Sequence, residues 1–387
     1  MSEIDIDAVR ADTPGCGEVI HLNNAGASLP PTPVLSATID FLEAEARTGS
    51  YEVASSRVED LNRVYDAGAV LLGCQANELA YLPSATHAWN AALRSVAFEP
   101  GDRVLATTSE YVANVYGLIQ LQDEGVDIDL IPEESDGQAS LEGLEKLLDE
   151  RVKLVCATHV PTSGGLVNPV AEIGRLAGEA GALYLLDATQ SAGQMSLAVD
   201  ELGCDFLAIT GRKFLRGPRG TALLYARSDL EGLRDPLIMD GRSARWTDDW
   251  AYELSEGARR YETFETNVAA KVGFGVAIEY ALRIGLDSIS KRVTDLADSL
   301  RTRLATSPLV RLTDLDGPQS GIVTFYVEGR SSEAVVAALR AWGVNTSVVE
   351  PLPSGFDPQR RVAQSLIRAS VHYFNTEEEL DDAVAAL

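Results

Sequence analysis

The sequence predicts an α/β protein in which helices cover a mainly parallel sheet and a small α+β domain follows at the C-terminal end. From residue 100 onward, short runs that are apolar throughout alternate with helical patterns. Strands buried on both faces of a parallel sheet have this uniformly apolar character. The 387 residues, 45% of them apolar, suffice for one large α/β domain with a smaller one appended.

The N-terminal part is predicted to begin with an irregular, acidic arm over residues 1–20. A turn-rich stretch of Asn, Gly and Pro over residues 23–31 precedes an amphipathic helix over 32–48. A second helix is expected over 56–72, where apolar residues share a face at three- to four-residue spacing.

The central sheet is predicted from six apolar runs, with helices over Leu141–Asp149 and Val170–Ala180 between some of them. In such sheets ligands bind beyond the carboxyl ends of the strands. The expected strands are Arg103–Thr107, Val126–Ile131, Lys153–Thr158, Leu183–Asp187, Phe206–Thr210 and Ala222–Tyr225.

The segment 231–264 has little periodicity and holds two tryptophans, Trp246 and Trp250. They indicate either a loop that shapes the substrate site or two half-buried packing residues.

Beyond this segment the sequence predicts a small α+β domain. Two helices are expected first, over 267–284 and 291–305. The domain itself is expected from a strand over 321–327, a helix over 332–342, a strand over 366–374 and a helix over 376–386. The predicted division is an arm over 1–20, a large domain over 21–265, and a linking helix with the small domain over 266–387.

Composition narrows the classes of partner. A formal net charge of −26 disfavours binding to nucleic acid or to anionic membrane surfaces. No apolar run approaches the ~20 residues that span a bilayer, and the acidic N-terminus shows no signal peptide. Four scattered cysteines without metal-type spacing indicate reduced thiols, no metal site and a cytoplasmic protein.

Lys213 is the most informative of the five lysines. It follows a strongly apolar strand in a loop with Gly211 and Gly217, where an α/β protein places its chemistry. Desolvation and neighbouring arginines would lower its pKa and help the free amine to form a Schiff base. Simple anion binding by this basic loop is an equally good interpretation of the segment alone. The other lysines, Lys146, Lys153, Lys271 and Lys291, are predicted to be solvated surface charges.

Asp187 ends a predicted buried strand, where an unpaired carboxylate is costly. Taken alone, it is best explained as the N-cap of a following helix. With a candidate Schiff-base lysine 26 residues later, pairing with the pyridinium nitrogen of pyridoxal phosphate (PLP) becomes the better explanation.

The stretch Ser84–His87 precedes a helical pattern and carries small hydroxyl residues. A helix start of this kind leaves backbone N–H groups for an anion such as a phosphate, although ordinary helix capping explains it equally. Thr210 and Arg212 could add contacts from the lysine loop.

Together these motifs, in this order, resemble the class V aminotransferase branch of the fold-type I PLP-dependent enzymes. The resemblance extends from about His21 to Thr376. This branch includes cysteine desulfurases, isopenicillin N epimerase-like proteins and the carbon–sulfur lyase of ergothioneine synthesis. It implies a fold-type I transferase fold with PLP as cofactor.

The resemblance assigns cofactor contacts residue by residue. Lys213 matches the Schiff-base lysine and Asp187 the partner of the pyridine nitrogen, and both are expected to be catalytic. Tyr111 matches the ring that stacks on the pyridine. The complete set of implied cofactor-binding residues is Ala85, Thr86, Tyr111, Thr162, Asp187, Gln190, Thr210, Arg212, Lys213 and Asn267.

The resemblance also implies substrate and subunit contacts. Arg368 matches the arginine that binds the substrate carboxylate, a bidentate pairing that would fix the Cα bonds relative to the cofactor ring. A surface arginine paired with an acid is the alternative. Asn24 is expected beside the substrate. The segment Arg259–Asn267 resembles the part that reaches the phosphate of the neighbouring subunit, which implies a homodimer with its site at the interface.

One departure bears on the reaction. Cysteine desulfurases need a nucleophilic cysteine ahead of the Arg368 motif, whereas Cys204 is the last cysteine here. Amino transfer on a small amino-acid substrate is therefore the leading expectation. Carbon–sulfur β-lysis comes next, followed by epimerisation or carbon–carbon bond formation. A non-catalytic anion-binding scaffold is the alternative from another class.

Overall fold

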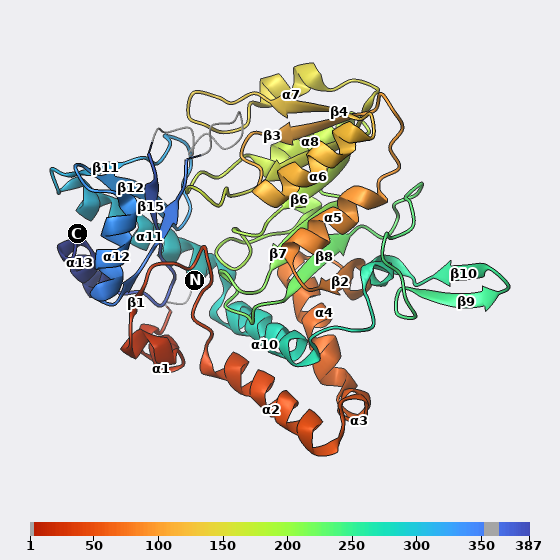
Figure 1. The fold of residues 1–387 in the computed structure, drawn as a ribbon, viewed down its shortest axis with the longest axis horizontal. Helices are drawn as coiled ribbons and strands as arrows, with labels where there is room; N and C mark the ends of the chain where they lie inside the picture. The colour runs from red at the N-terminus through yellow and green to blue at the C-terminus, as the bar shows by residue number, and fades with distance from the viewer. Residues whose placement is uncertain (1–3, 352–363) are drawn as a thin grey trace.

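The computed structural model describes residues 4–351 and 364–387 and contains the predicted mainly parallel sheet. Its seven strands lie in the order β2-β8-β7-β6-β5-β3-β4 (Figure 1). The five strands from β7 to β4 are parallel, and β8 is antiparallel to both of its neighbours. The strands are β2 (Leu79–Leu82), β3 (Arg103–Thr107), β4 (Asp127–Ile131), β5 (Val152–Thr158), β6 (Leu183–Asp187), β7 (Phe206–Thr210) and β8 (Ala222–Ala226).

Helices cover both faces of this sheet because successive strand residues point to opposite sides. Val104 and Ala106 pack in one apolar cluster with α5 and α6, whereas Leu105 belongs to the cluster formed with α4, α7, α8 and α10. The α/β prediction is thus confirmed. The covering helices are α4 (Val58–Leu72), α5 (Ala85–Ser95), α6 (Val112–Asp123), α7 (Leu141–Leu147), α8 (Val170–Glu179) and α10 (Val268–Ile284).

The small C-terminal domain lies to the left of this body in Figure 1. It has a four-stranded antiparallel sheet in the order β11-β12-β15-β14. Its elements are α11 (Leu286–Ala305), β11 (Val310–Leu312), β12 (Ile322–Val327), α12 (Ser332–Ala341), β13 (Val344–Asn345), β14 (Ser347–Val349), β15 (Leu366–Ser370) and α13 (Glu377–Ala385).

The N-terminal segment differs from the prediction in two respects. The arm expected to be irregular contains α1 (Ile6–Ala11), capped by the Asp5 side chain, and a short 3₁₀ turn, η1 (Pro14–Gly17). Strand β1 (Ile20–His21) then pairs in parallel with β13, so this start of the chain joins the small domain. Residues 1–3 of the predicted arm lie outside the described residues.

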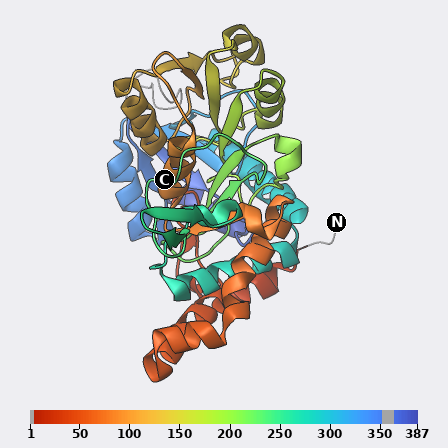
Figure 2. The ribbon, with the colours of Figure 1, turned by 90° about the vertical axis from the view of Figure 1, so that its right-hand side faces the viewer.

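The helix expected over 56–72 is α4, and a short helix that was not expected, α3 (Ser50–Ser56), precedes it. With α2 (Thr32–Thr48), α3 forms the orange projection at the lower end of Figure 2. Helix α10 packs against both α2 and α4, which ties the linking helix to the large domain. The remaining short elements are η2 (Ala76–Glu78), α9 (Val199–Leu202) and η3 (Gly257–Tyr261).

The segment without periodicity contains an antiparallel hairpin, β9 (Ala244–Asp248) and β10 (Ala251–Leu254), which projects from the body in Figure 1. Trp246 is 78% and Trp250 99% exposed, so they are not half-buried packing residues within this chain. Within the described part of the chain, no helix has the length and apolar character needed to cross a membrane.

Candidate active site

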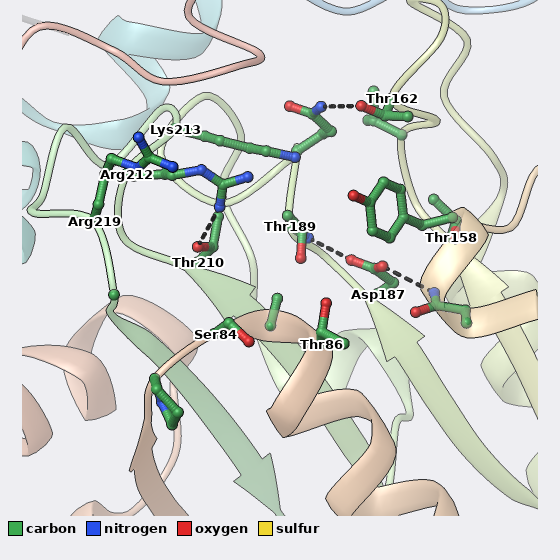
Figure 3. Close-up of a pocket in the computed structure, with 17 residues that line it drawn as sticks. Ser84, Thr86, Thr158, Thr162, Asp187, Thr189, Thr210, Arg212, Lys213 and Arg219 are labelled. Carbon is green, nitrogen blue, oxygen red and sulfur yellow. Dashed lines mark hydrogen bonds between the residues drawn. The ribbon is translucent and has the colours of Figure 1, made fainter. Parts of the chain in front are cut away.

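A cavity of about 270 Å³ lies at the carboxyl ends of the central strands. Thr158, Asp187 and Thr210 are the last residues of β5, β6 and β7, and all three line it (Figure 3). Neighbouring parallel strands end at the same edge, which brings distant segments together. The predicted cofactor residues that line the cavity are Ala85, Thr86, Tyr111, Thr162, Asp187, Gln190, Thr210, Arg212 and Lys213.

Lys213 follows β7 directly and is only 5% exposed. Burial, reinforced by the Arg212 charge, lowers the pKa of this amine to about 7, and Asp187 acts in the opposite direction. Among the described residues, its Nζ has no hydrogen-bond or salt-bridge partner. A lysine that is substantially neutral near pH 7 and has no internal partner is suited to act as a nucleophile or proton carrier.

Asp187 is also buried, and both of its carboxylate oxygens accept hydrogen bonds. Oδ1 accepts from the Thr189 backbone N–H at 2.9 Å, and Oδ2 from Asn114 Nδ2 at 3.0 Å (Figure 3). The carboxylate forms no salt bridge within the described chain. A buried carboxylate held in place without a cation suits a ligand that brings a positive charge, such as a pyridinium nitrogen.

The end of the cavity at the start of α5 is built for an anion. Ser84 caps this helix by accepting a hydrogen bond from the His87 N–H at 3.2 Å. Arg212 and Arg219 add two guanidinium groups to the lining, and Arg212 Nη1 donates to Thr210 Oγ1 at 3.1 Å. A helix N-terminus and two arginines together suit a phosphate.

The lining therefore fits PLP, which carries a ring nitrogen, an aldehyde and a phosphate. Figure 3 shows Lys213 and Arg212 on one side of the site and Asp187 on the other. Two buried polar atoms of the lining, Gln190 Oε1 and Thr189 Oγ1, have no hydrogen-bond partner within the described chain. Orphaned polar atoms of this kind are costly unless a ligand or water satisfies them.

Arg368 lies on β15 beside this cavity and is 8% exposed. Its Nη1 donates to the Thr162 carbonyl at 2.5 Å and to Thr162 Oγ1 at 3.1 Å, and Nη2 donates to Asn23 Oδ1 at 3.4 Å. Burial lowers its pKa to about 10, so the group stays charged at neutral pH. It forms no salt bridge within the described chain, so the surface ion pair considered from the sequence is absent there.

Asn24 does not line the cavity. It is fully buried, with Nδ2 donating to the Ser370 carbonyl at 2.7 Å and Oδ1 accepting from Ser28 Oγ at 2.7 Å. These bonds fix the turn in which it lies. The preceding residue, Asn23, is the one that contacts Arg368.

Asn267 is also absent from the first cavity. It is the N-cap of α10, where its side chain accepts a hydrogen bond from the Ala270 N–H, and it lines a second cavity of about 860 Å³. Lys271 shares that cavity and is only 8% exposed, so the prediction of a solvated surface charge was wrong. The uniformly apolar neighbours on α10 indicate this burial.

Several lining residues were not predicted: Asn114, Thr158, Thr189 and Arg219. Asn114 lies three positions after Tyr111 at the start of α6, so helical spacing could have indicated it. Arg219 belongs to the same glycine-rich loop as Lys213. Among the described residues, no group of three or more His, Cys, Asp or Glu side chains is placed to hold a metal ion.

Comparison with known proteins matches residues 20–382 to the family described as Aminotransferase class-V. A probable cysteine desulfurase of Methanothermobacter thermautotrophicus is 29% identical, covering 96% of this chain and 94% of that protein. A cysteine desulfurase of Dickeya dadantii is also 29% identical, covering 99% of this chain and 96% of that protein.

Solved structures share the fold over almost the whole chain. The apo cysteine desulfurase of Thermococcus onnurineus superposes with a TM-score of 0.89 at 26% identity and covers 100% of this chain and 97% of its own. The cystine C–S lyase C-DES, in complex with its product cysteine persulfide, has a TM-score of 0.86 at 23% identity, with 96% and 98% covered. At this lower identity the likeness to C-DES shows the fold.

Proposed function

The chain belongs to the class V aminotransferase family of PLP-dependent enzymes, and from that membership we propose that it cleaves a carbon–sulfur bond of a small amino-acid substrate. The reaction proposed is a β-elimination at Cα and Cβ. Family membership sets aside the non-catalytic scaffold considered from the sequence. Amino transfer, the leading expectation from the sequence, becomes the competing outcome.

The residues of the cavity supply the steps of this reaction. Bound PLP supplies an electron sink that makes the Cα proton of an attached amino acid acidic. Lys213 takes that proton, because its amine is buried and substantially neutral near pH 7. Asp187 would hold the protonated ring nitrogen of the cofactor, and Arg368 would bind the substrate carboxylate. The Cβ–S electron pair leaves with sulfur, and water then converts the remaining enamine to a ketoacid and ammonia.

The absence of a thiol from the cavity lining is the observation that favours lysis over desulfuration. Cys16, Cys74, Cys156 and Cys204 are the only cysteines of the chain, and none lines the cavity. Burial raises the pKa of all four, which makes them poor nucleophiles. An enzyme without a cysteine to receive sulfur must release it to a small molecule.

The relatives support cleavage at sulfur in general. Their names describe cysteine desulfurases, and C-DES, which shares the fold, is described as a cystine C–S lyase. Both activities begin with cysteine-type substrates. Cystine or cysteine is accordingly the proposed substrate class.

We also propose a homodimer that brings Asn267 to the cofactor phosphate of the neighbouring subunit. The cavity that Asn267 lines is bordered by exposed apolar side chains, among them Tyr51 at 70% and Phe264 at 60% exposed. Exposed apolar clusters of this kind are typical of protein interfaces. Analytical ultracentrifugation should give twice the monomer mass, and a monomer with full PLP affinity would contradict this part.

We also propose that the protein is located in the cytoplasm. Its four cysteines are free, which is typical of proteins in a reducing compartment.

A product assay tests the proposed reaction. Purified enzyme with PLP is offered cysteine, cystine and a set of sulfur-free amino acids, with and without a ketoacid acceptor. The proposal predicts ketoacid and ammonia without any acceptor, together with hydrogen sulfide from cysteine and cysteine persulfide from cystine. Turnover that requires an acceptor and yields a new amino acid would show amino transfer instead, and an inverted amino acid would show epimerisation.

A further inference from the structure

Glu110 is a buried carboxylate that does not line the active-site cavity. Three side chains donate hydrogen bonds to it. Thr107 Oγ1 donates to Oε1 at 2.8 Å, while Thr158 Oγ1 and Asn114 Nδ2 donate to Oε2 at 3.0 and 2.9 Å. Because all three groups donate, the ionised form of Glu110 is well satisfied.

Asn114 connects this carboxylate to the cavity. The same Nδ2 atom that donates to Glu110 also donates to Asp187 Oδ2 at 3.0 Å. The two hydrogens of one amide group thus serve two carboxylates, one behind the cavity wall and one in it. Thr158, another partner of Glu110, also lines the cavity.

We propose that Glu110 is a positioning residue that fixes Asn114, and through it Asp187, and adds a second negative charge behind the carboxylate that faces the cofactor's ring nitrogen. This inference rests on the proposed PLP chemistry. Asn114 with only one acceptor could turn away from Asp187, whereas two acceptors fix its amide plane. In a site that excludes water, a second negative charge favours a protonated ring nitrogen.

The titratable groups around Glu110 determine how its charge depends on pH. Burial raises the pKa of Glu110 to about 7, with the donor Asn114 lowering it and the Asp187 charge raising it. Burial keeps the Cys156 thiol on β5 and the Tyr184 phenol on β6 neutral, because it raises both pKa values well above the ordinary ones. Lys213, whose pKa is lowered to about 7 by burial although the Asp187 charge raises it, is the other group that titrates near neutral pH.

Glu110→Gln tests the charge with little change in shape. The readout is the pH midpoint of the visible absorbance of bound PLP, measured together with the dissociation constant of PLP. We expect the midpoint to fall by about one pH unit, because one nearby negative charge is lost. We also expect kcat to fall more than KM rises. Glu134→Gln, which removes an exposed carboxylate, is the matched control and should leave the midpoint unchanged.

Thr107→Val is the second variant, and it tests the role of the Glu110 charge if Glu110→Gln does not fold. It removes one donor to the Glu110 carboxylate and one acceptor of the Thr158 backbone N–H, while Thr107 itself does not line the cavity. Because this disfavours the ionised carboxylate, the midpoint should move in the same direction by a smaller amount. If the variants fold and bind PLP but the pH midpoint of its absorbance is unchanged, the positioning role of Glu110 is overturned, whereas the proposed function is not. A wild-type protein that binds no PLP would overturn the proposed function, and this inference with it.

The apoprotein gives a readout independent of the cofactor. The pKa of Glu110 is about 7 when folded and near the ordinary glutamate value when unfolded, so between about pH 4.5 and 7 the folded state binds more protons. Its contribution to stability therefore falls as the pH rises through this range. In a Lys213→Ala background, which removes the lysine titration, this fall should be present with Glu110 and absent with Glu110→Gln. A fall that continues well above pH 7 would mean that Glu110 is uncharged at neutral pH, and would overturn the inference.

Discussion

Two buried lysines of this chain, Lys213 and Lys271, show how differently burial can be used. Each is less than a tenth exposed, and burial lowers the pKa of each, to about 7 and about 8 respectively. Lys271 Nζ donates to Tyr65 Oη at 2.5 Å and lies 4.3 Å from the centre of the Tyr65 ring. Lys213 has no such partner within the described chain.

The environment of Lys271 is a closed network around Glu262. Glu262 accepts from Tyr65 Oη at 2.6 Å and forms ion pairs with Arg242 and Arg259, each at 3.0 Å. A lysine with its partners in place stabilises the fold, whereas a buried lysine without them is available for chemistry. The comparison teaches that the partners, and not the depth of burial, distinguish a reactive lysine from a structural one.

The largest expected effect is on catalysis. Lys213→Ala removes the proposed proton carrier and should reduce turnover by roughly 10³-fold or more. Lys271→Ala, its matched control, should leave the turnover of the folded enzyme within about threefold of wild type. Steady-state assays of both variants measure this contrast, and comparable losses in the two would erase the proposed distinction between them.

The next largest effect is on the free energy of unfolding, through the network around Lys271. Glu262→Gln leaves three cations and a phenol around a neutral amide, and should lower the free energy of unfolding by about 3 kcal/mol or more. Denaturant titration of the apoprotein gives this value. Glu265→Gln, three residues away and exposed, should change it by less than about 0.5 kcal/mol. Equal stability of the two variants would show that the network contributes little.

The sequence predicted the central sheet and most of the cavity for a physical reason. Uniformly apolar strands must be buried on both faces, and their carboxyl ends converge, so Asp187 and Lys213 could be placed without a structure. Strand β2 was missed because four apolar residues beside a helix carry no distinguishing period. The exposed hairpin β9–β10 was missed because it buries neither face.

Side-chain direction could not be read from the sequence. Asn23 and Asn24 are adjacent in a turn, and only the hydrogen bonds to residues more than 300 positions away decide which of them contacts Arg368. Glu110 directly precedes the N-cap of α6 and Asn114 lies in its first turn, yet their link to Asp187 crosses between elements far apart in the chain. Long-range contacts of this kind leave no local pattern.

A variant of Arg368 tests whether this residue binds the substrate carboxylate, as distinct from the role of Lys213 in catalysis. Arg368→Ala should raise KM for carboxylate substrates by roughly 10- to 100-fold, because a charge-assisted pair is lost. Arg368→Lys keeps the charge without the planar fork and should recover part of that loss. Steady-state kinetics with an amino acid and its decarboxylated amine separate carboxylate recognition from general damage. An equal loss for both compounds would remove Arg368 from the carboxylate site.

The smallest expected effect is the pH dependence of apoprotein stability. The pKa of Lys213 is about 7 when folded against 10.5 ordinarily, so above pH 7 the unfolded state binds more protons. The stability contributed by this group should therefore rise between pH 7 and 10. Lys213→Met should flatten that rise. If stability still rises with pH in this variant, the rise comes from titratable groups other than Lys213.

The most direct test of the account is to locate the cofactor on the chain. Holoenzyme is treated with borohydride, digested, and its peptides are sequenced by mass spectrometry. The account predicts one phosphopyridoxyl group, attached to Lys213, and none on Lys271 or any other lysine. A cofactor fixed elsewhere, or a protein that takes up no PLP at all, would contradict it.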